Sequence, residues 1–185
     1  MSKIAAISSV WLLALAMSNA HAADIRFTGE LVAASCKVSG GGTPDNIAVN
    51  MGKVSTQDLG TGAAGAFGPT TDINLTIDCA SGMVGLSTVK MSFDPFSGTG
   101  SHYDDSRLLA LENSPGAATG VGIALINDAN TILNLSKNEP VSAPLVVTGG
   151  AATAELHLRA AYIKAGAILK AGPANANMPF SLSYE

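Results

Sequence analysis

The last residues of the chain alternate between apolar and polar side chains in a pattern that predicts a β-strand. Successive side chains of a strand point to opposite faces, so this segment has one apolar face and one polar face. No sequence follows that could fold back on it, and we expect its edge to require a partner from elsewhere. The apolar positions are Ala174, Ala176, Met178, Phe180, Leu182 and Tyr184.

The first 22 residues are organised like a secretory signal peptide. Lys3 gives a basic start, residues 4–17 are an apolar stretch too short to span a bilayer, and residues 20–22 form a small-x-small cleavage site. We therefore expect cleavage before Ala23 and export from the cytoplasm. A retained membrane anchor is the alternative interpretation.

The segment after the predicted cleavage site is a second alternating strand. Each large apolar side chain in it would gain roughly 1.5–3 kcal/mol from full burial, which favours a partner for this face too. An ordinary first strand of the domain's own sheet is the alternative. The apolar positions Ile25, Phe27, Gly29 and Leu31 alternate with Arg26, Thr28 and Glu30.

Composition and charge exclude some classes of binding partner for this chain and favour others. The net charge is −4 and no basic cluster occurs, which argues against nucleic acid and anionic membrane surfaces. Charged residues make up 13% of the chain, about half of the usual share, while 47% is hydrophobic. For an exported protein, this balance predicts surface that a partner protein covers.

Cys36 and Cys79 both lie in the exported part of the chain. Two cysteines in an oxidising compartment are expected to form a disulfide. A metal site is the weaker alternative, because the chain has no Cys-x-x-Cys motif and no His close to either cysteine.

Strand signals dominate the rest of the chain, and turn-rich Gly and Pro segments separate them. Many short strands with such joints predict an all-β fold, an antiparallel β-sandwich. Residues 151–171 could form a helix by propensity, but their alternation favours a strand. Besides the two terminal segments, the predicted strands are Ala34–Ser39, Ile47–Val54, Asp72–Cys79, Thr88–Asp94, Val121–Ile126, Thr131–Leu135 across the 127–130 turn, and Glu155–Lys164.

Catalytic signatures are absent from the sequence, and we expect no enzyme activity, cofactor or metal. His157 stands in an alternating strand and His102 in a predicted loop beside Asp104 and Asp105, which is a poor metal-binding pattern. The glycine run at 60–65 lacks the Lys of a phosphate-binding loop, and no Gly-x-Ser-x-Gly motif occurs.

An ordered set of short blocks resembles the pilin subunits that Gram-negative bacteria assemble by the chaperone–usher route, as in type 1 and P-type fimbriae. The resemblance spans nearly the whole mature chain, and its most specific part is the ending, where Gly172 begins the last strand and Tyr184 is the penultimate residue. The other blocks are Phe27–Val38, Val49–Val54, Phe67–Cys79, Gly122–Leu125 and Ala160–Tyr162.

The resemblance implies an incomplete immunoglobulin-like sandwich that lacks its final strand and is completed by donor-strand exchange. A periplasmic chaperone would first fill the gap and deliver the subunit to an outer-membrane usher. The N-terminal strand of the next subunit would then replace the chaperone strand, giving a cell-surface fimbria that supports adhesion, with a host receptor bound through the fibre tip. β-Strand addition of this kind gains affinity from backbone hydrogen bonds and specificity from alternate side chains.

The same resemblance assigns roles to residues and divides the chain into residues 1–22 (signal peptide), 23–35 (donor strand) and 36–185 (pilin domain). Cys36 and Cys79 match the family disulfide. The donor stripe is Ile25, Phe27, Gly29 and Leu31, and the groove-lining and chaperone-binding strand contains Gly172, Met178, Phe180, Leu182 and Tyr184.

Two features depart from the family pattern. Only four residues precede Phe27 after cleavage, and Pro179 removes a ladder donor from the terminal strand. A minor adaptor or terminator subunit therefore stays an alternative to a rod subunit. A further alternative is a subunit with its own lateral receptor-binding patch in the 96–119 loop.

Overall fold

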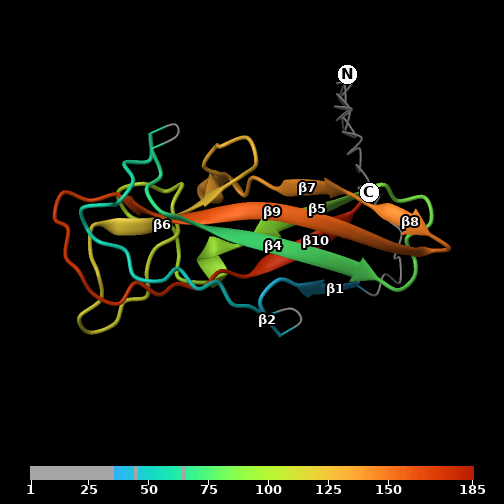
Figure 1. The fold of residues 1–185 in the computed structure, drawn as a ribbon, viewed down its shortest axis with the longest axis horizontal. Coiled ribbons are helices and arrows are strands. Elements are labelled where there is room, and N and C mark those ends of the chain that lie inside the picture. Colours follow the sequence, from blue (N-terminus) through green and yellow to red (C-terminus); the bar gives the residue numbers. More distant parts are fainter. Residues whose placement is uncertain (1–35, 44–45, 64–65) are drawn as a thin grey trace, which may run out of the picture. The chain divides into compact units, whose positions relative to one another are not determined.

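The computed structural model describes residues 36–43, 46–63 and 66–185, and within these ranges the protein is all-β (Figure 1). Two short 3-10 turns, Pro95–Ser97 and Leu135–Lys137, are the helical elements there. No helix in the described part is long and apolar enough to cross a membrane. The donor stripe predicted at residues 25–31 lies outside the described residues.

The larger sheet is antiparallel, with the strand order β1-β4-β9-β6 and the short β8 beside one end of β9. Its register runs without a break along the long β4–β9 pair, from Thr70 opposite Ala161 to Cys79 opposite Ala152. The strands are β1 (Cys36–Ser39), β4 (Thr70–Cys79), β6 (Val121–Ile126), β8 (Val146–Thr148) and β9 (Ala151–Lys164).

The smaller sheet has the order β10-β5-β7 and is also antiparallel. In the view of Figure 1, β4 and β9 pass in front of β5 and β10. The strands are β5 (Thr88–Phe93), β7 (Val141–Pro144) and β10 (Phe180–Tyr184), and a separate two-residue pair joins β2 (Gly42–Thr43) to β3 (Asn46–Ile47).

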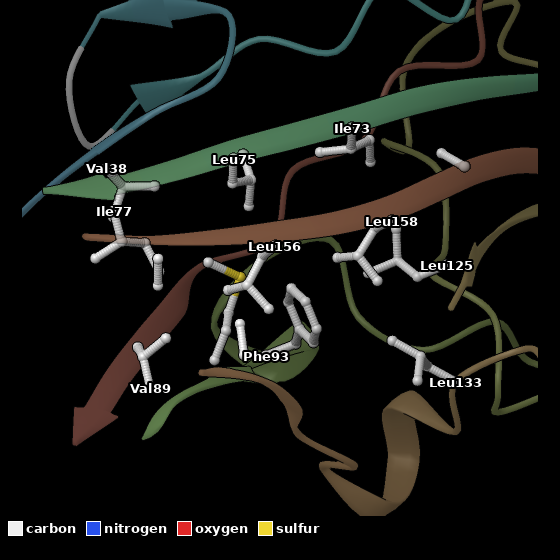
Figure 2. Packing of buried hydrophobic residues seen from close by; sticks show 14 of the residues in the cluster. Val38, Ile73, Leu75, Ile77, Val89, Phe93, Leu125, Leu133, Leu156 and Leu158 are labelled. Carbon is white, nitrogen blue, oxygen red and sulfur yellow. The ribbon is translucent and has the colours of Figure 1, made fainter. Parts of the chain in front are cut away.

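The main core lies between the two sheets, as the period-2 patterns predict. In β4 every second residue from Ile73 to Cys79 is buried, and the residues between them are exposed. Val89, Met91 and Phe93 of β5 are buried in the same way. Figure 2 shows Val89 and Phe93 in the same cluster as Leu156 and Leu158 of the larger sheet, and Met91 belongs to this cluster too.

A second, smaller core covers the outer face of β6 and the end of β9. All six residues of β6 are buried, because Ile123 and Leu125 face the main core while Ala124 and Ile126 belong to the second cluster. The remaining members of this second cluster are Phe67, Leu108, Ile132, Ala161 and Ile163. A strand buried on both faces reads as a continuous apolar run, as the sequence of β6 does.

Several predicted strands differ in extent from the observed ones: Glu155–Lys164 begins earlier, at Ala151, and two others are mostly not strands. Of Ile47–Val54, only Ile47 is in a strand, and the rest of the segment is irregular, with a φ of +64° at Gly52. The segment 131–135 does return beside β6, but the contact is a single bridge from Ile132 to Ile126 before the chain enters a 3-10 turn.

The sequence interpretation missed β7 and β8 altogether. In β8 all three residues are exposed, so it carries no alternating signal, and in β7 the alternation extends over only four residues with Ala143 as the one buried side chain. The helical alternative for residues 151–171 is excluded, since Ala151–Lys164 is the longest strand of the described chain.

Candidate functional site

The C-terminal segment keeps its predicted alternation throughout. Every even-numbered residue from 174 to 184 is half-buried and every odd-numbered residue between them is exposed. Ala176, Met178, Phe180, Leu182 and Tyr184 pack against the main core from its margin. We refer to the six even-numbered side chains as the terminal stripe.

The long loop between β5 and β6 holds the first half of this segment in an extended conformation. Backbone N–H groups of this loop donate to the carbonyl groups of odd-numbered residues, at distances of 2.8–3.0 Å. These bonds are Asp94 to Pro179, Thr99 to Asn177, Glu112 to Asn175 and Ala118 to Pro173. One edge of the segment is therefore occupied before β10 begins.

In β10 the odd-numbered residues again bond to the occupied edge, which here is formed by β5. Glu185 and Thr88 exchange both backbone hydrogen bonds, at 2.9 Å each, and such pairs alternate along an antiparallel ladder with pairs that exchange none. In this register Phe180 and Leu182 belong to the pairs that exchange no backbone hydrogen bonds with β5. Their backbone N–H and C=O groups thus point to the edge away from β5, and no other strand of the described chain pairs with β10.

The structure gives a specific reason why Pro179 is tolerated. As an odd-numbered residue it directs its backbone towards the occupied edge, where its carbonyl accepts from Asp94. The N–H group that proline lacks would point to that same side, beyond the last pair of the ladder, Phe180 with Phe93. The outer edge keeps the donors of Met178, Phe180 and Leu182.

The first strand of the larger sheet is also an edge strand. Cys36 and Cys79 are direct cross-strand partners in β1 and β4 and form the predicted disulfide. Cys36, Ile47 and Met51 are partly buried against the same core as the terminal stripe. Among the described strands, each sheet thus has one such edge, β1 in the larger sheet and β10 in the smaller one.

A cavity of about 340 Å³ lies at the start of the terminal stripe. Its wall combines the segment 52–59, the segment 169–175, and side chains including Val121 and Tyr162. The Tyr162 hydroxyl donates to the carbonyl of Ala174 at 2.9 Å, and burial raises the pKa of this hydroxyl, so it remains a donor at neutral pH. The wall at this point is therefore fixed by a hydrogen bond.

Gly172 is needed where the segment passes the loop before β6. A Cβ atom there would collide with the carbonyl oxygen of Gly116 and lie 2.8 Å from the carbonyl carbon of Ala117. No larger residue fits without a backbone shift. The predicted start of the last strand is thus a point of close chain contact, and the strand proper begins at Phe180.

Within the described ranges, the side chains of the loop at 96–119 and the histidines do not come together in a metal-binding group. Asp105 accepts hydrogen bonds from the backbone and side chain of Arg107, and the Arg107 guanidinium lowers the pKa of this carboxyl. His157 is exposed and lies 3.0 Å from the Asn74 amide oxygen across the sheet. Among the described residues, no three His, Cys, Asp or Glu side chains are grouped to hold a metal.

The same loop carries two highly exposed aromatic side chains, Phe96 at 72% and Tyr103 at 96%. Exposed aromatic residues of this kind are compatible with a surface contact, but nothing in the described residues shows what they contact. The receptor-binding interpretation of this loop stays a prediction.

A two-sheet antiparallel sandwich in which β1 and β10 are edge strands among the described residues defines the class, an immunoglobulin-like pilin fold. The crystal structure of the P pilus rod subunit PapA has this fold, with a TM-score of 0.50 and 22% identity over 88% of this chain and 99% of that chain.

The family described as Fimbrial protein matches residues 25–185, and the chain belongs to this family. It is 30% identical to Long polar fimbria protein A of Salmonella typhimurium (strain LT2), over 94% of this chain and 92% of the relative. It is 28% identical to the type-1 fimbrial protein A chain of Escherichia coli (strain K12), over 99% of this chain and 100% of the relative.

Proposed function

We propose that the chain is a structural subunit of a cell-surface fimbria and polymerises by strand donation between copies. The observation that carries the proposal is that the C-terminal segment forms backbone hydrogen bonds along one of its two edges. The carbonyl groups of its odd-numbered residues accept hydrogen bonds from β5 and from the loop between β5 and β6, while Phe180 and Leu182 turn their backbone groups to the other edge. An added strand at this edge would bond to these groups and cover the terminal stripe at the same time.

The donor in this proposal is the segment 23–35 of a neighbouring copy. Its apolar face, formed by Ile25, Phe27, Gly29 and Leu31, has the period of two that a strand beside β10 requires. Burying its three large side chains would contribute roughly 1.5–3 kcal/mol each. Since each copy donates at one end and accepts at the other, the contacts do not close and an open filament results.

The route to the surface follows from the same chemistry. A subunit with an exposed apolar edge would aggregate unless a periplasmic chaperone covered the edge before delivery to an outer-membrane usher. The signal peptide at residues 1–22 would start this route, and the finished fimbria would support adhesion. The role is structural rather than catalytic.

A matched pair of substitutions on β10 tests the accepting edge. Leu182→Asp places a charge on the half-buried face, whereas Ser183→Asp places the same charge on the exposed face one residue away. We expect the first variant to lose polymerisation and the second to keep it, as measured by electron microscopy of sheared cells. Equal polymerisation of both variants would overturn the assignment of the accepting face.

A second matched pair tests the donor without touching the pilin domain. Phe27→Asp should stop polymerisation, whereas Thr28→Asp on the opposite face should not. Deleting residues 23–31 should leave a subunit that still binds its chaperone but is absent from fibres. Normal fibres from the deletion would refute the donor assignment.

Removal of residues 180–185 tests chaperone capture. The truncated chain lacks β10, so we expect no co-purification with a periplasmic chaperone and rapid degradation in the periplasm. Recovery of a stable chaperone complex would contradict this. The copy number of the subunit in sheared fibres separates a rod subunit, with many copies, from an adaptor or terminator, with one or few.

A further inference from the structure

The lining of the cavity beside Ala174 is basic, although the chain as a whole is acidic. Lys53 and Lys170 both line it, both are exposed, and neither forms an ion pair within the described residues. No Asp or Glu lines the cavity. The net charge of the chain is −4, so this pairing of two lysines stands out from the average surface.

Local structure holds the backbone of both lysines in place. Lys170 lies in a bridge with Thr119, whose N–H and C=O groups exchange hydrogen bonds of 3.1 Å with its own. Lys53 directly follows Gly52, which has a φ of +64° and donates its N–H to the side chain of Asn50 at 3.0 Å. The two lysine side chains therefore project from ordered backbone positions in the lining of the cavity.

We propose that Glu30 of a second copy pairs with Lys53 and Lys170 and so fixes the orientation of the donated strand. The inference rests on the proposed function and adds to it a charged recognition site at one end of the accepting edge. The donor segment carries acidic residues at both ends, Asp24 beside Ile25 and Glu30 beside Leu31. Which of them reaches the cavity depends on the direction of the added strand.

An antiparallel arrangement selects Glu30. The cavity lies at the start of the C-terminal segment, so an antiparallel donor brings the later residues of its stripe to that end. Antiparallel pairing is also slightly more stable per residue than parallel pairing. Leu31 would then face the cavity, and Glu30, on the opposite face, would lie at the mouth between the two lysines.

The expected effect is on association rate and orientation more than on final stability. Exposed ion pairs add little stability, whereas complementary charges at the rim of an interface raise the association rate and make it depend on salt. The donor segment can pair with the accepting edge in more than one register along the terminal stripe, and the lysines would attract only one end of it. A charge at one end favours a single register and a single direction.

The test compares initial polymerisation rates of the full mature chain, followed by light scattering after dilution from denaturant. Rates are measured at ionic strengths of about 0.01 M and about 1 M, where Debye lengths are about 30 Å and about 3 Å. Glu30→Lys should slow polymerisation about tenfold at low salt, within the range of electrostatic steering. At high salt its rate should equal that of the unmodified chain.

Reversing the charges on both sides of the proposed contact tests whether Glu30 pairs with these two lysines. Adding Lys53→Glu and Lys170→Glu to Glu30→Lys should restore the low-salt rate, while adding them to Asp24→Lys should not. Lys137→Glu, an exposed change on a 3-10 turn outside the cavity lining, is the control and should behave like the unmodified chain. If a combined variant fails to fold, the association rate of a synthetic 23–31 peptide, with and without Glu30→Lys, decides the question.

The outcomes separate this inference from the proposed function. If the unmodified chain forms fibres but Glu30→Lys has no salt-dependent effect, the charged recognition is wrong and strand donation stands. Rescue of Asp24→Lys instead of Glu30→Lys would overturn the assignment to Glu30 and reverse the strand. If the unmodified chain forms no fibres at all, the proposed function itself fails.

Discussion

Removing the disulfide between Cys36 and Cys79 should cost this domain a large part of its stability. The bond joins residues 43 positions apart and closes the chain between β1 and the end of β4. The chain-entropy relation for a closed loop of that length gives about 13 cal/mol/K, or about 4 kcal/mol near room temperature. A whole domain is commonly stable by only about 5–15 kcal/mol.

The structure indicates where the loss appears first. β1 is a four-residue edge strand that pairs with β4 alone in the described chain, and Val38 is its one buried side chain. Without the covalent link to Cys79, the described contacts of this strand are a short ladder with β4 and the packing of Val38 and Cys36 on the core. Hydrogen exchange at residues 37–39 should therefore accelerate more than exchange at the centre of β4.

The assay is equilibrium urea unfolding of the mature chain, followed by circular dichroism. Oxidised chain, chain reduced with a thiol, and the Cys36→Ala/Cys79→Ala variant are compared. We expect the free energy of unfolding to fall by about 3–4 kcal/mol on reduction and somewhat further in the variant, because removing a buried sulfur also leaves a small cavity. The variant should not respond to the thiol.

The result that would refute this reasoning is a reduced chain within about 1 kcal/mol of the oxidised chain, well below the loop-closure value. That outcome would mean that the unfolded chain already keeps the two cysteines close, or that the β1–β4 ladder is sufficient without the bond. Unchanged exchange at residues 37–39 on reduction would refute the local part of the prediction separately.

Three further predictions concern the core, the cavity wall and the surface. Leu156→Ala should lower the free energy of unfolding by about 2–5 kcal/mol in urea titrations, because this side chain is 2% exposed at the centre of the main core. Tyr162→Phe removes the hydrogen bond to the carbonyl of Ala174, and should cost about 1 kcal/mol in the same assay and weaken binding of a 23–31 peptide. Asp105→Asn should lower stability slightly at neutral pH, by about 1 kcal/mol or less, because the pair with Arg107 is only partly buried and stays in contact with solvent. Since Arg107 lowers the pKa of Asp105, the contribution of the carboxylate is present above the ordinary pKa of 3.8 and is lost as pH falls through the lowered value, so the variant should show a smaller loss of stability on acidification.

The sequence predicted strands best where one face is buried and the other is solvated. The runs in β4, β5 and β9 were predicted because burial of every second side chain leaves a period of two in the sequence. β8 has no buried residue and left no such pattern. Of the predicted strand Ile47–Val54 only Ile47 is in a strand, because the apolar pattern does not record which other segment is available to pair with it.

The candidate site likewise has a part that local alternation predicted and a part that it did not. The terminal stripe was predicted residue by residue, since one face of an extended segment needs only alternation to be recognised. The lysines at the cavity could not be predicted, because Lys53 and Lys170 are 117 positions apart (170 − 53) and only the fold brings them to one cavity. The donor stripe at residues 25–31 stays a prediction.

The amino-acid sequence by itself determined the all-β class, the disulfide partners and the apolar face of the last strand, because each follows from local periodicity or residue chemistry. Tertiary structure alone decided which edge of that strand is occupied. Phe180 and Leu182 turn their backbone groups away from β5 because Glu185 pairs with Thr88, and that register is set by contacts between segments far apart in the chain.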